Sequence, residues 1–235
     1  WDRVSETLYY GDGSLRTGVG SSWYGHRLIG TCGGGMGYSD PGEIARDAHL
    51  REGSPELAVD ASGRVFFTDD HKIEYIDEHG ILQLYADIQV LMGPAVGPMA
   101  DPLDIAFDPD GRLIVLLTAP TEPGPGAPSD PQVQVVRFMT PTTWEVIAGT
   151  GTSPPSTGLL GTDVDMDLRT FNQLAVDRDG NVFVSGDRAH PIPFVSSWHP
   201  AGVHVIRPDG RWEALLEPPP VAEGQVTATN CAHPD

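Results

Sequence analysis

The sequence is poor in basic residues and has no long apolar run. Lysine and arginine together number 14 against 33 aspartates and glutamates, which gives a formal net charge of −19. Proteins that bind nucleic acid need a basic surface, as do proteins that lie on anionic lipid, so we exclude both as partners. The longest strongly apolar run covers only residues 113–117, whereas a membrane-spanning helix needs about 20 residues. We therefore expect no membrane insertion.

Cysteine is also scarce. Cys32 and Cys231 are the only two, too few for a scaffold held together by disulfides. We expect them to lie at opposite faces of a regular blade, which disfavours a bond between them but does not exclude one. The chain starts at Trp1 and carries no apolar leader, so we expect a mature product or a processed fragment.

Glycine and proline, by contrast, are abundant, with 28 and 22 residues. Both destabilise helix interiors and both suit turns. This composition excludes a protein of long helices and favours many short strands. The one helix we expect spans residues 41–50, with Asp40 as its N-cap and Pro41 at its first position.

Three stretches of the chain share one pattern, an apolar strand, then Asp-x-x-Gly, then a second apolar strand. They read LAVDASGRVFFTDD (57–70), IAFDPDGRLIVLLT (105–118) and LAVDRDGNVFVSGD (174–187). The aspartate can cap the turn with its side chain, and the glycine accepts a positive φ. Each stretch therefore predicts a β-hairpin.

The repeat continues beyond the hairpins. Third strands are predicted at 72–76, 133–138 and 202–206, and fourth strands at 81–86, 144–149 and 212–217. Repeated units of four antiparallel strands are typical of propeller blades. We therefore expect an all-β fold, a β-propeller of about four blades.

The N-terminal stretch supplies a second, third and fourth strand but no first strand. Residues 230–235, NCAHPD, align with residues 105–110, IAFDPD, and we predict a first strand at about 225–232. On this interpretation the single domain, 1–235, has a composite blade (1–31 plus 222–235) and whole blades at 32–87, 88–150 and 151–221. Closure by both termini would hide open sheet edges. The alternative is a partial segment of a six-bladed propeller.

The hairpin pattern LAVDxxGxVFxxD resembles an NHL repeat. The linkers at 29–50 and 148–168 resemble the segments between NHL blades, and the opening LYYGDGSLR is similar to the lead-in of NHL propellers in teneurin-like and bacterial Rhs (YD-repeat) proteins. The resemblance implies an NHL-type propeller in an extracellular or secreted protein. NHL propellers are mostly interaction platforms, with a few lyases and lactonase-like relatives.

We therefore expect a non-enzymatic protein-interaction or scaffold module within a larger extracellular or secreted toxin- or adhesin-like protein. Its partners would be proteins or other domains of a larger polypeptide, and it would need no cofactor. The insertion at 189–200 carries the best-placed contact residues, which are His190, Phe194, Trp198 and His199. Exposed aromatic side chains often anchor interfaces, although Trp198 could equally cap its own blade.

The alternative is a metal-dependent lactonase- or lyase-like enzyme with its site in the central channel. Glu56 and Asp104 immediately precede the LAVD-like run in two repeats, and Gln173 takes this place in the third. Carboxylate and amide oxygens are ligands that Ca²⁺ and Mg²⁺ prefer. His49 and Asn172 are further candidates near these positions. The recurring polar position could also simply mark solvated strand starts.

A second group of acidic residues, Asp163, Asp165 and Asp167, alternates along the chain. Closely spaced carboxylates can bind Ca²⁺, but Leu168 follows them in place of the glycine that a calcium loop needs. A solvated face of an alternating strand is the competing interpretation. The glycine-rich stretch 33–37 has no following lysine or helix, and no G-x-S-x-G motif occurs, so a phosphate-binding loop and a serine nucleophile of that type have no support.

Overall fold

A computed structural model describes residues 7–11, 15–19, 26–29, 41–48, 55–93, 100–119, 132–153, 156–166, 173–185 and 202–216. In these residues the protein is all-β, with four antiparallel sheets, one α-helix and two short 3-10 helices. This confirms the predicted fold class. No helix in the described ranges is long and apolar enough to span a membrane.

Three of the sheets contain four strands each, hydrogen-bonded in chain order. The first full blade consists of β4 (Leu57–Val59), β5 (Val65–Asp69), β6 (Lys72–Ile76) and β7 (Leu82–Asp87). The second full blade consists of β8 (Pro102–Phe107), β9 (Leu113–Ala119), β10 (Gln132–Thr140) and β11 (Thr143–Ala148). The third full blade consists of β12 (Gln173–Val176), β13 (Val182–Ser185), β14 (Val203–Ile206) and β15 (Trp212–Leu216).

The N-terminal sheet contains three strands, β1 (Thr7–Gly11), β2 (Leu15–Val19) and β3 (His26–Ile29). Its contacts match those of a full blade. β3 contacts the 3-10 helix η1 (Ala45–Asp47), just as the fourth strand β11 contacts η3 (Gly161–Asp163). β1 contacts β4 of the next blade, just as the second strand β5 contacts β8. The three strands therefore take the second to fourth positions of a blade. Residues 222–235, which we expect to supply the first strand, lie outside the described ranges, so closure by both termini stays a prediction.

The turn after each first strand is built by the aspartate of the repeat. Asp60 Oδ1 accepts hydrogen bonds from the backbone N–H groups of Ser62 and Arg64, at 2.9 and 2.8 Å. Asp108 and Asp177 make the same two contacts with the residues two and four positions later. Gly63 closes the first of these turns with a φ of 83°, which glycine adopts without steric cost. Each copy of the sequence repeat therefore forms the same type of turn.

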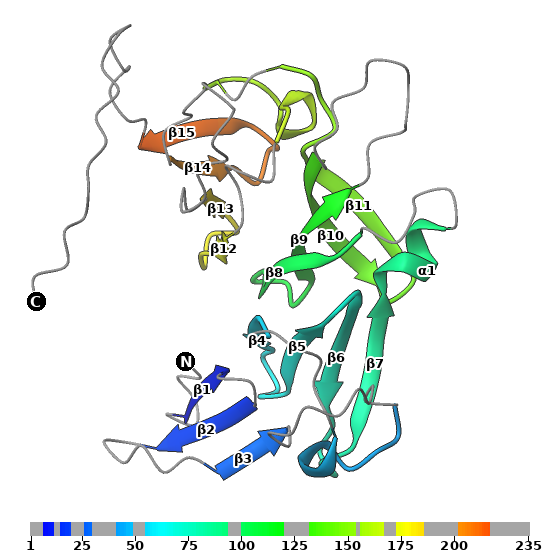
Figure 1. Cartoon of the computed structure of the whole chain (residues 1–235). Helices are drawn as coiled ribbons and strands as arrows, with labels where there is room; N and C mark the ends of the chain where they lie inside the picture. The colour runs from blue at the N-terminus through cyan, green and yellow to red at the C-terminus, as the bar shows by residue number, and fades with distance from the viewer. Residues whose placement is uncertain are drawn as a thin grey trace, which may run out of the picture.

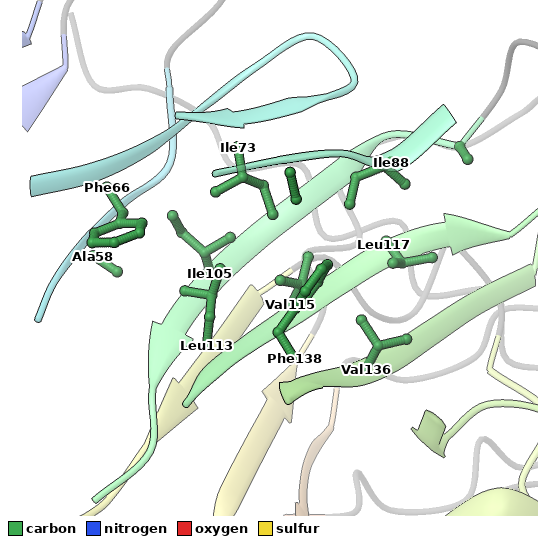
Figure 2. Close-up of a cluster of buried hydrophobic side chains, with 12 residues drawn as sticks. Ala58, Phe66, Ile73, Ile88, Ile105, Leu113, Val115, Leu117, Val136 and Phe138 are labelled. Atoms are coloured by element: carbon green, nitrogen blue, oxygen red, sulfur yellow. The ribbon is translucent and has the colours of Figure 1, made fainter. Parts of the chain in front are cut away.

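The first strands lie toward the middle of the arrangement, and the fourth strands lie at its outside (Figure 1). β8 contacts β4 on one side and β12 on the other. Apolar side chains fill the space between consecutive blades. Figure 2 shows this packing between the first and second full blades, where Phe66 and Ile73 meet Ile105 and Val115. A second cluster, with Trp212 fully buried, joins the second and third full blades.

The expected helix at 41–50 is wrong. The chain forms only the 3-10 helix η1 there, because Ile44 is extended and bridges Ile81 in an antiparallel pair. A short α-helix occurs instead at α1 (Ile88–Met92), where Asp87 caps the first turn by accepting from Val90 N at 3.0 Å. Pairing with the neighbouring sheet therefore overrides the local helix signal at Pro41.

Candidate active site

The beginnings of the first strands carry polar residues at one recurring position. The last residues of β4, β8 and β12 pair with the first residues of β5, β9 and β13. Three residues before the last residue of each first strand stand Glu56, Asp104 and Gln173. The strand pairing therefore places the three residues at equivalent points of successive blades, at the end of the sheets where the first strands begin. We call this end the mouth.

Alternation along the strands directs these side chains toward the following blade. Successive side chains of a strand point to opposite faces. Ala58, two residues after Glu56, packs between the first and second full blades, and Ala106, two residues after Asp104, packs between the second and third. Glu56 is thus directed toward β8, and Asp104 toward β12.

Asp104 is held firmly in this position. Its Oδ2 accepts a hydrogen bond from Leu174 N in β12 at 2.6 Å, and its Oδ1 accepts one from Ile105 N at 2.8 Å. The pairing of β8 with β9 shifts register between Pro102 and Asp104. Such an irregularity bends the strand and changes the direction of its side chains. Burial raises the pKa of Asp104, and the two backbone hydrogen bonds offset only part of this rise.

Glu56 is fixed through its backbone, while its carboxyl group stays accessible. Glu56 N donates to Thr68 Oγ1 at 3.0 Å, and Thr68 N donates to the Glu56 carbonyl at 3.1 Å. The residue as a whole is exposed, but neighbouring protein removes part of the water around its carboxyl group. This desolvation raises the pKa of Glu56, and the negative charge of Asp104 raises it further. The two carboxylates therefore act on each other across the boundary between blades.

Two mutually repelling carboxylates favour a positive partner. A bound cation or a proton would relieve the repulsion that raises the pKa of Glu56. In the described part of the chain, no three histidine, cysteine or acidic side chains converge on a metal. A cation at the mouth would therefore be held by two carboxylates with amide, carbonyl or water oxygens, and Gln173 is the amide at the same strand position. Such an all-oxygen donor set fits Ca²⁺ or Mg²⁺.

The acidic stretch 163–167 has a different structure from the predicted alternating strand. Asp163 is the last residue of η3, and its carbonyl accepts from Ser153 N at 3.2 Å. Asp163 and Asp165 are both exposed, on either side of the buried Val164. Asp167 lies outside the described residues.

Several other candidate residues also fall outside the described ranges. They are His49, Asn172, the contact residues His190, Phe194, Trp198 and His199, and the two cysteines Cys32 and Cys231. Their expected roles stay predictions.

Sequence reasoning missed one group at the mouth. His71, between β5 and β6, lies with Nδ1 2.8 Å from Asp70 Oδ2 and Nε2 3.7 Å from Asp87 Oδ2. The adjacent Asp–His pair was a weak signal, but Asp87 lies far along the chain, so no motif spacing could reveal the group.

No protein-family model matches this chain, and no curated protein matches it. Among solved structures, it is similar to a gluconolactonase from Xanthomonas campestris, with 16% identity, a TM-score of 0.42 and coverage of 76% of this chain and 57% of that one. A structural-genomics target, which bears the name "putative gluconolactonase", gives 16% identity and a TM-score of 0.40, with coverage of 72% of this chain and 54% of that one. PorZ, a surface component of the type-IX secretion system of Porphyromonas gingivalis, gives 14% identity and a TM-score of 0.41, with coverage of 85% and 23%.

This chain thus spans only about half the length of the two gluconolactonases. The expectation of a non-enzymatic interaction or scaffold module is contradicted: the two similar structures whose names state an activity are both named after an enzyme, gluconolactonase. The error has a physical origin. A site assembled from several blades would leave no local motif, so the lack of a motif in the sequence is no evidence against a site. The four-stranded sheets in chain order are those of a β-propeller. The three structures named above give no support to the NHL-type and Rhs-like assignment.

Proposed function

We propose that this protein is a lactonase-like hydrolase with its site at the mouth. The observation that carries this proposal is the pair of carboxylates, Glu56 and Asp104, at equivalent positions of consecutive blades. Burial and mutual repulsion raise the pKa of Glu56, and burial raises the pKa of Asp104. Neighbouring carboxyl groups with perturbed pKa values are typical of functional sites.

The site would take a divalent cation, with Ca²⁺ or Mg²⁺ as the ions that suit its oxygen donors. When bound, the cation would polarise the carbonyl group of a lactone. Asp104 contributes a fixed ligand, because two backbone N–H groups hold its oxygens. Glu56 contributes an accessible one, because only its backbone is fixed. The small number of charged ligands supports weak binding, of the millimolar kind found in extracellular calcium modules.

Cation binding can be measured by thermal unfolding with Ca²⁺, Mg²⁺ or Zn²⁺ against a chelator. A ligand at 100 times its dissociation constant adds about 2.7 kcal/mol of stability, or roughly 5–10 °C in a domain of this size. We expect Ca²⁺ or Mg²⁺ to produce such a shift. Glu56→Gln and Asp104→Asn should abolish it.

The matched control is Glu78→Gln, which makes the same charge change at a carboxylate that is 86% exposed in the turn between β6 and β7. This variant should keep the full shift. The proposal fails if no ion shifts the melting temperature and elemental analysis finds no metal in the purified protein. An equal shift in the Asp104→Asn protein would place any bound ion elsewhere.

The finer class of the propeller is also a proposal. The aspartate turns after β4, β8 and β12 support an NHL-type blade, and the resemblance of LYYGDGSLR to teneurin-like and Rhs proteins supports an extracellular or secreted location within a larger polypeptide. Fractionation of the source cells with an antibody to this domain would test the location. Recovery only from the cytoplasmic fraction would contradict it.

A further inference from the structure

A histidine lies between two carboxylates at the same end of the first full blade as Glu56. His71 stands in the turn between β5 and β6, and Asp87 ends β7. Asp70 Oδ2 lies 2.8 Å from His71 Nδ1, a hydrogen bond, whereas Asp87 Oδ2 lies 3.7 Å from Nε2, beyond a direct one. The His71 side chain is 20% exposed. The ring is therefore oriented, and solvent still reaches it.

The contact with Asp70 decides which nitrogen of the ring carries the proton. A carboxylate can only accept a hydrogen bond, so Nδ1 is the protonated nitrogen and Nε2 keeps its lone pair. The neighbouring β7–α1 junction is fixed as well, since Ile88 N donates to the His71 carbonyl at 2.9 Å. An imidazole held by a carboxylate at Nδ1, with an accepting Nε2, is the arrangement of a general base.

Two carboxylates lie close to the His71 ring. Asp70 faces the ring from its own turn, and Asp87 faces it from the end of β7. Asp69 and Lys72 flank the turn on either side and are backbone partners in the pairing of β5 with β6.

The backbone of this turn is unusual. Asp70 has a φ of 58°, and it is the one residue other than glycine with a positive φ in the described part of the chain. This conformation is strained for most residues, and glycine, asparagine and aspartate tolerate it best. Glycine would form the turn without that cost, but it would supply no carboxylate to His71.

The group belongs to the mouth because of the blade topology. β4 and β5 are antiparallel, so β4 begins where β5 ends, and the β5–β6 turn and the β7–α1 junction lie at that same end (Figure 1). Thr68, which holds the backbone of Glu56, stands three residues before His71. Neighbouring strands are about 4.8 Å apart, so two strand spacings put the start of β6 about 10 Å from the start of β4. A small cyclic ester can occupy such a span.

We propose that His71, oriented by Asp70, is the general base of the lactone hydrolysis, an inference that rests on the proposed function. His71 Nε2 takes a proton from a water molecule while the water oxygen bonds to the lactone carbonyl carbon. The ring C–O bond then breaks, and the alkoxide oxygen that leaves takes the proton back from Nε2. The product is the open hydroxy acid, and no oxidant or further reactant is needed.

The test uses the full chain, δ-gluconolactone as the probe and a subtraction of the spontaneous hydrolysis. His71→Gln should lower kcat by about 100-fold or more, the usual contribution of a general base, with KM little changed. Asp70→Asn keeps a residue that tolerates the turn conformation, and it should lower kcat and alter the acidic limb of the pH–rate profile. His79→Gln is the control, because this ring is 77% exposed in the turn between β6 and β7. It should leave kcat unchanged.

Nitrogen-15 spectra of the imidazole rings provide a readout that does not depend on activity, and they should show His71 protonated at Nδ1. A kcat retained by His71→Gln, or a ring protonated at Nε2, would overturn the role of His71 and leave the proposed function standing. A wild-type protein with no lactone hydrolysis in the presence of Ca²⁺ or Mg²⁺ would overturn both. Melting temperatures of all variants identify any loss of kcat that comes from unfolding.

Discussion

At the scale of single residues, Glu56 and Asp104 stand at the same place in consecutive blades, and burial raises the pKa of both carboxyl groups. Their shared place before the LAVD-like run is visible in the repeat. The hydrogen bond from Leu174 N to Asp104, 2.6 Å long, joins residues of different blades, and no local pattern encodes it. The same holds for Asp87, which reaches His71 only through the pairing of β6 with β7.

Removal of the charge at Glu56 should stabilise the protein in the absence of metal. The pKa of Glu56 is raised by desolvation and by Asp104, so the charged form at neutral pH costs folding free energy. We expect Glu56→Gln to raise the melting temperature in chelator by a few degrees. Glu78→Gln, at an exposed position, should change it little. A lower melting temperature for Glu56→Gln would show that this carboxylate stabilises the fold.

Asp60 should give the protein an acid-sensitive stability. Burial acts to raise the pKa of Asp60, but hydrogen bonds from Ser62 and Arg64 outweigh it and hold the pKa below its usual value. A carboxyl group whose pKa is lower in the folded state stabilises the protein above its unfolded pKa of about 3.9, and this contribution is lost as the pH falls through the folded pKa.

The measurement for Asp60 is the free energy of unfolding in urea between about pH 5 and pH 2, across the window in which aspartates titrate. Asp60→Asn should show a smaller loss over this range than the wild type. Asp110→Asn, at a carboxylate that is 67% exposed, should follow the wild-type curve. If all three proteins lose stability equally, the lowered pKa of Asp60 has no part in acid unfolding.

At the scale of elements, the sequence predicts the blades well because each turn is built locally. The aspartate contacts at Asp60, Asp108 and Asp177 span only four residues, so the repeat contains everything that the turn needs. The linkers are harder to predict. The segment at 41–48 follows the pairing of Ile44 with Ile81, and such a contact between distant residues outweighs the local signal for a helix.

The linker after β11 should tolerate substitution less well than the hairpin turns. A Cβ atom at Gly149 would collide with the carbonyl oxygen of Val133, while a Cβ atom at Gly63 would meet nothing within 4 Å. Both glycines have a positive φ. We expect Gly63→Ala to cost about 1–2 kcal/mol and Gly149→Ala to cost clearly more. The midpoints of urea unfolding would show this difference in stability. Equal losses of stability in the two variants would contradict the close packing of the linker against β10.

At the scale of the whole molecule, composition and repeats predict the propeller, because every blade repeats the same strands and turns. They do not predict a function, because the polar residues at the mouth are single residues from three different blades. The N-terminal sheet has only the second to fourth strands of a blade among the described residues. Which segment supplies its first strand is a separate question.

Deletion of residues 222–235 tests the prediction that the C-terminal segment supplies that strand. Loss of a first strand would expose the edge of β1. The truncated protein should therefore melt cooperatively at a lower temperature. An unchanged melting temperature would show that the composite blade is wrong and would favour a segment of a larger ring.

In the function proposed above, Glu56 and Asp104 form a cation-dependent site for lactone hydrolysis. The most direct measurement is the rate of acid release from δ-gluconolactone in a pH-stat, with chelator and then with Ca²⁺ or Mg²⁺, for the wild type, Asp104→Asn and Glu78→Gln. We expect hydrolysis above the spontaneous rate only with the cation. This activity should be lost in Asp104→Asn and kept in Glu78→Gln. A wild-type rate equal to the spontaneous one, or one that Asp104→Asn leaves unchanged, would contradict it.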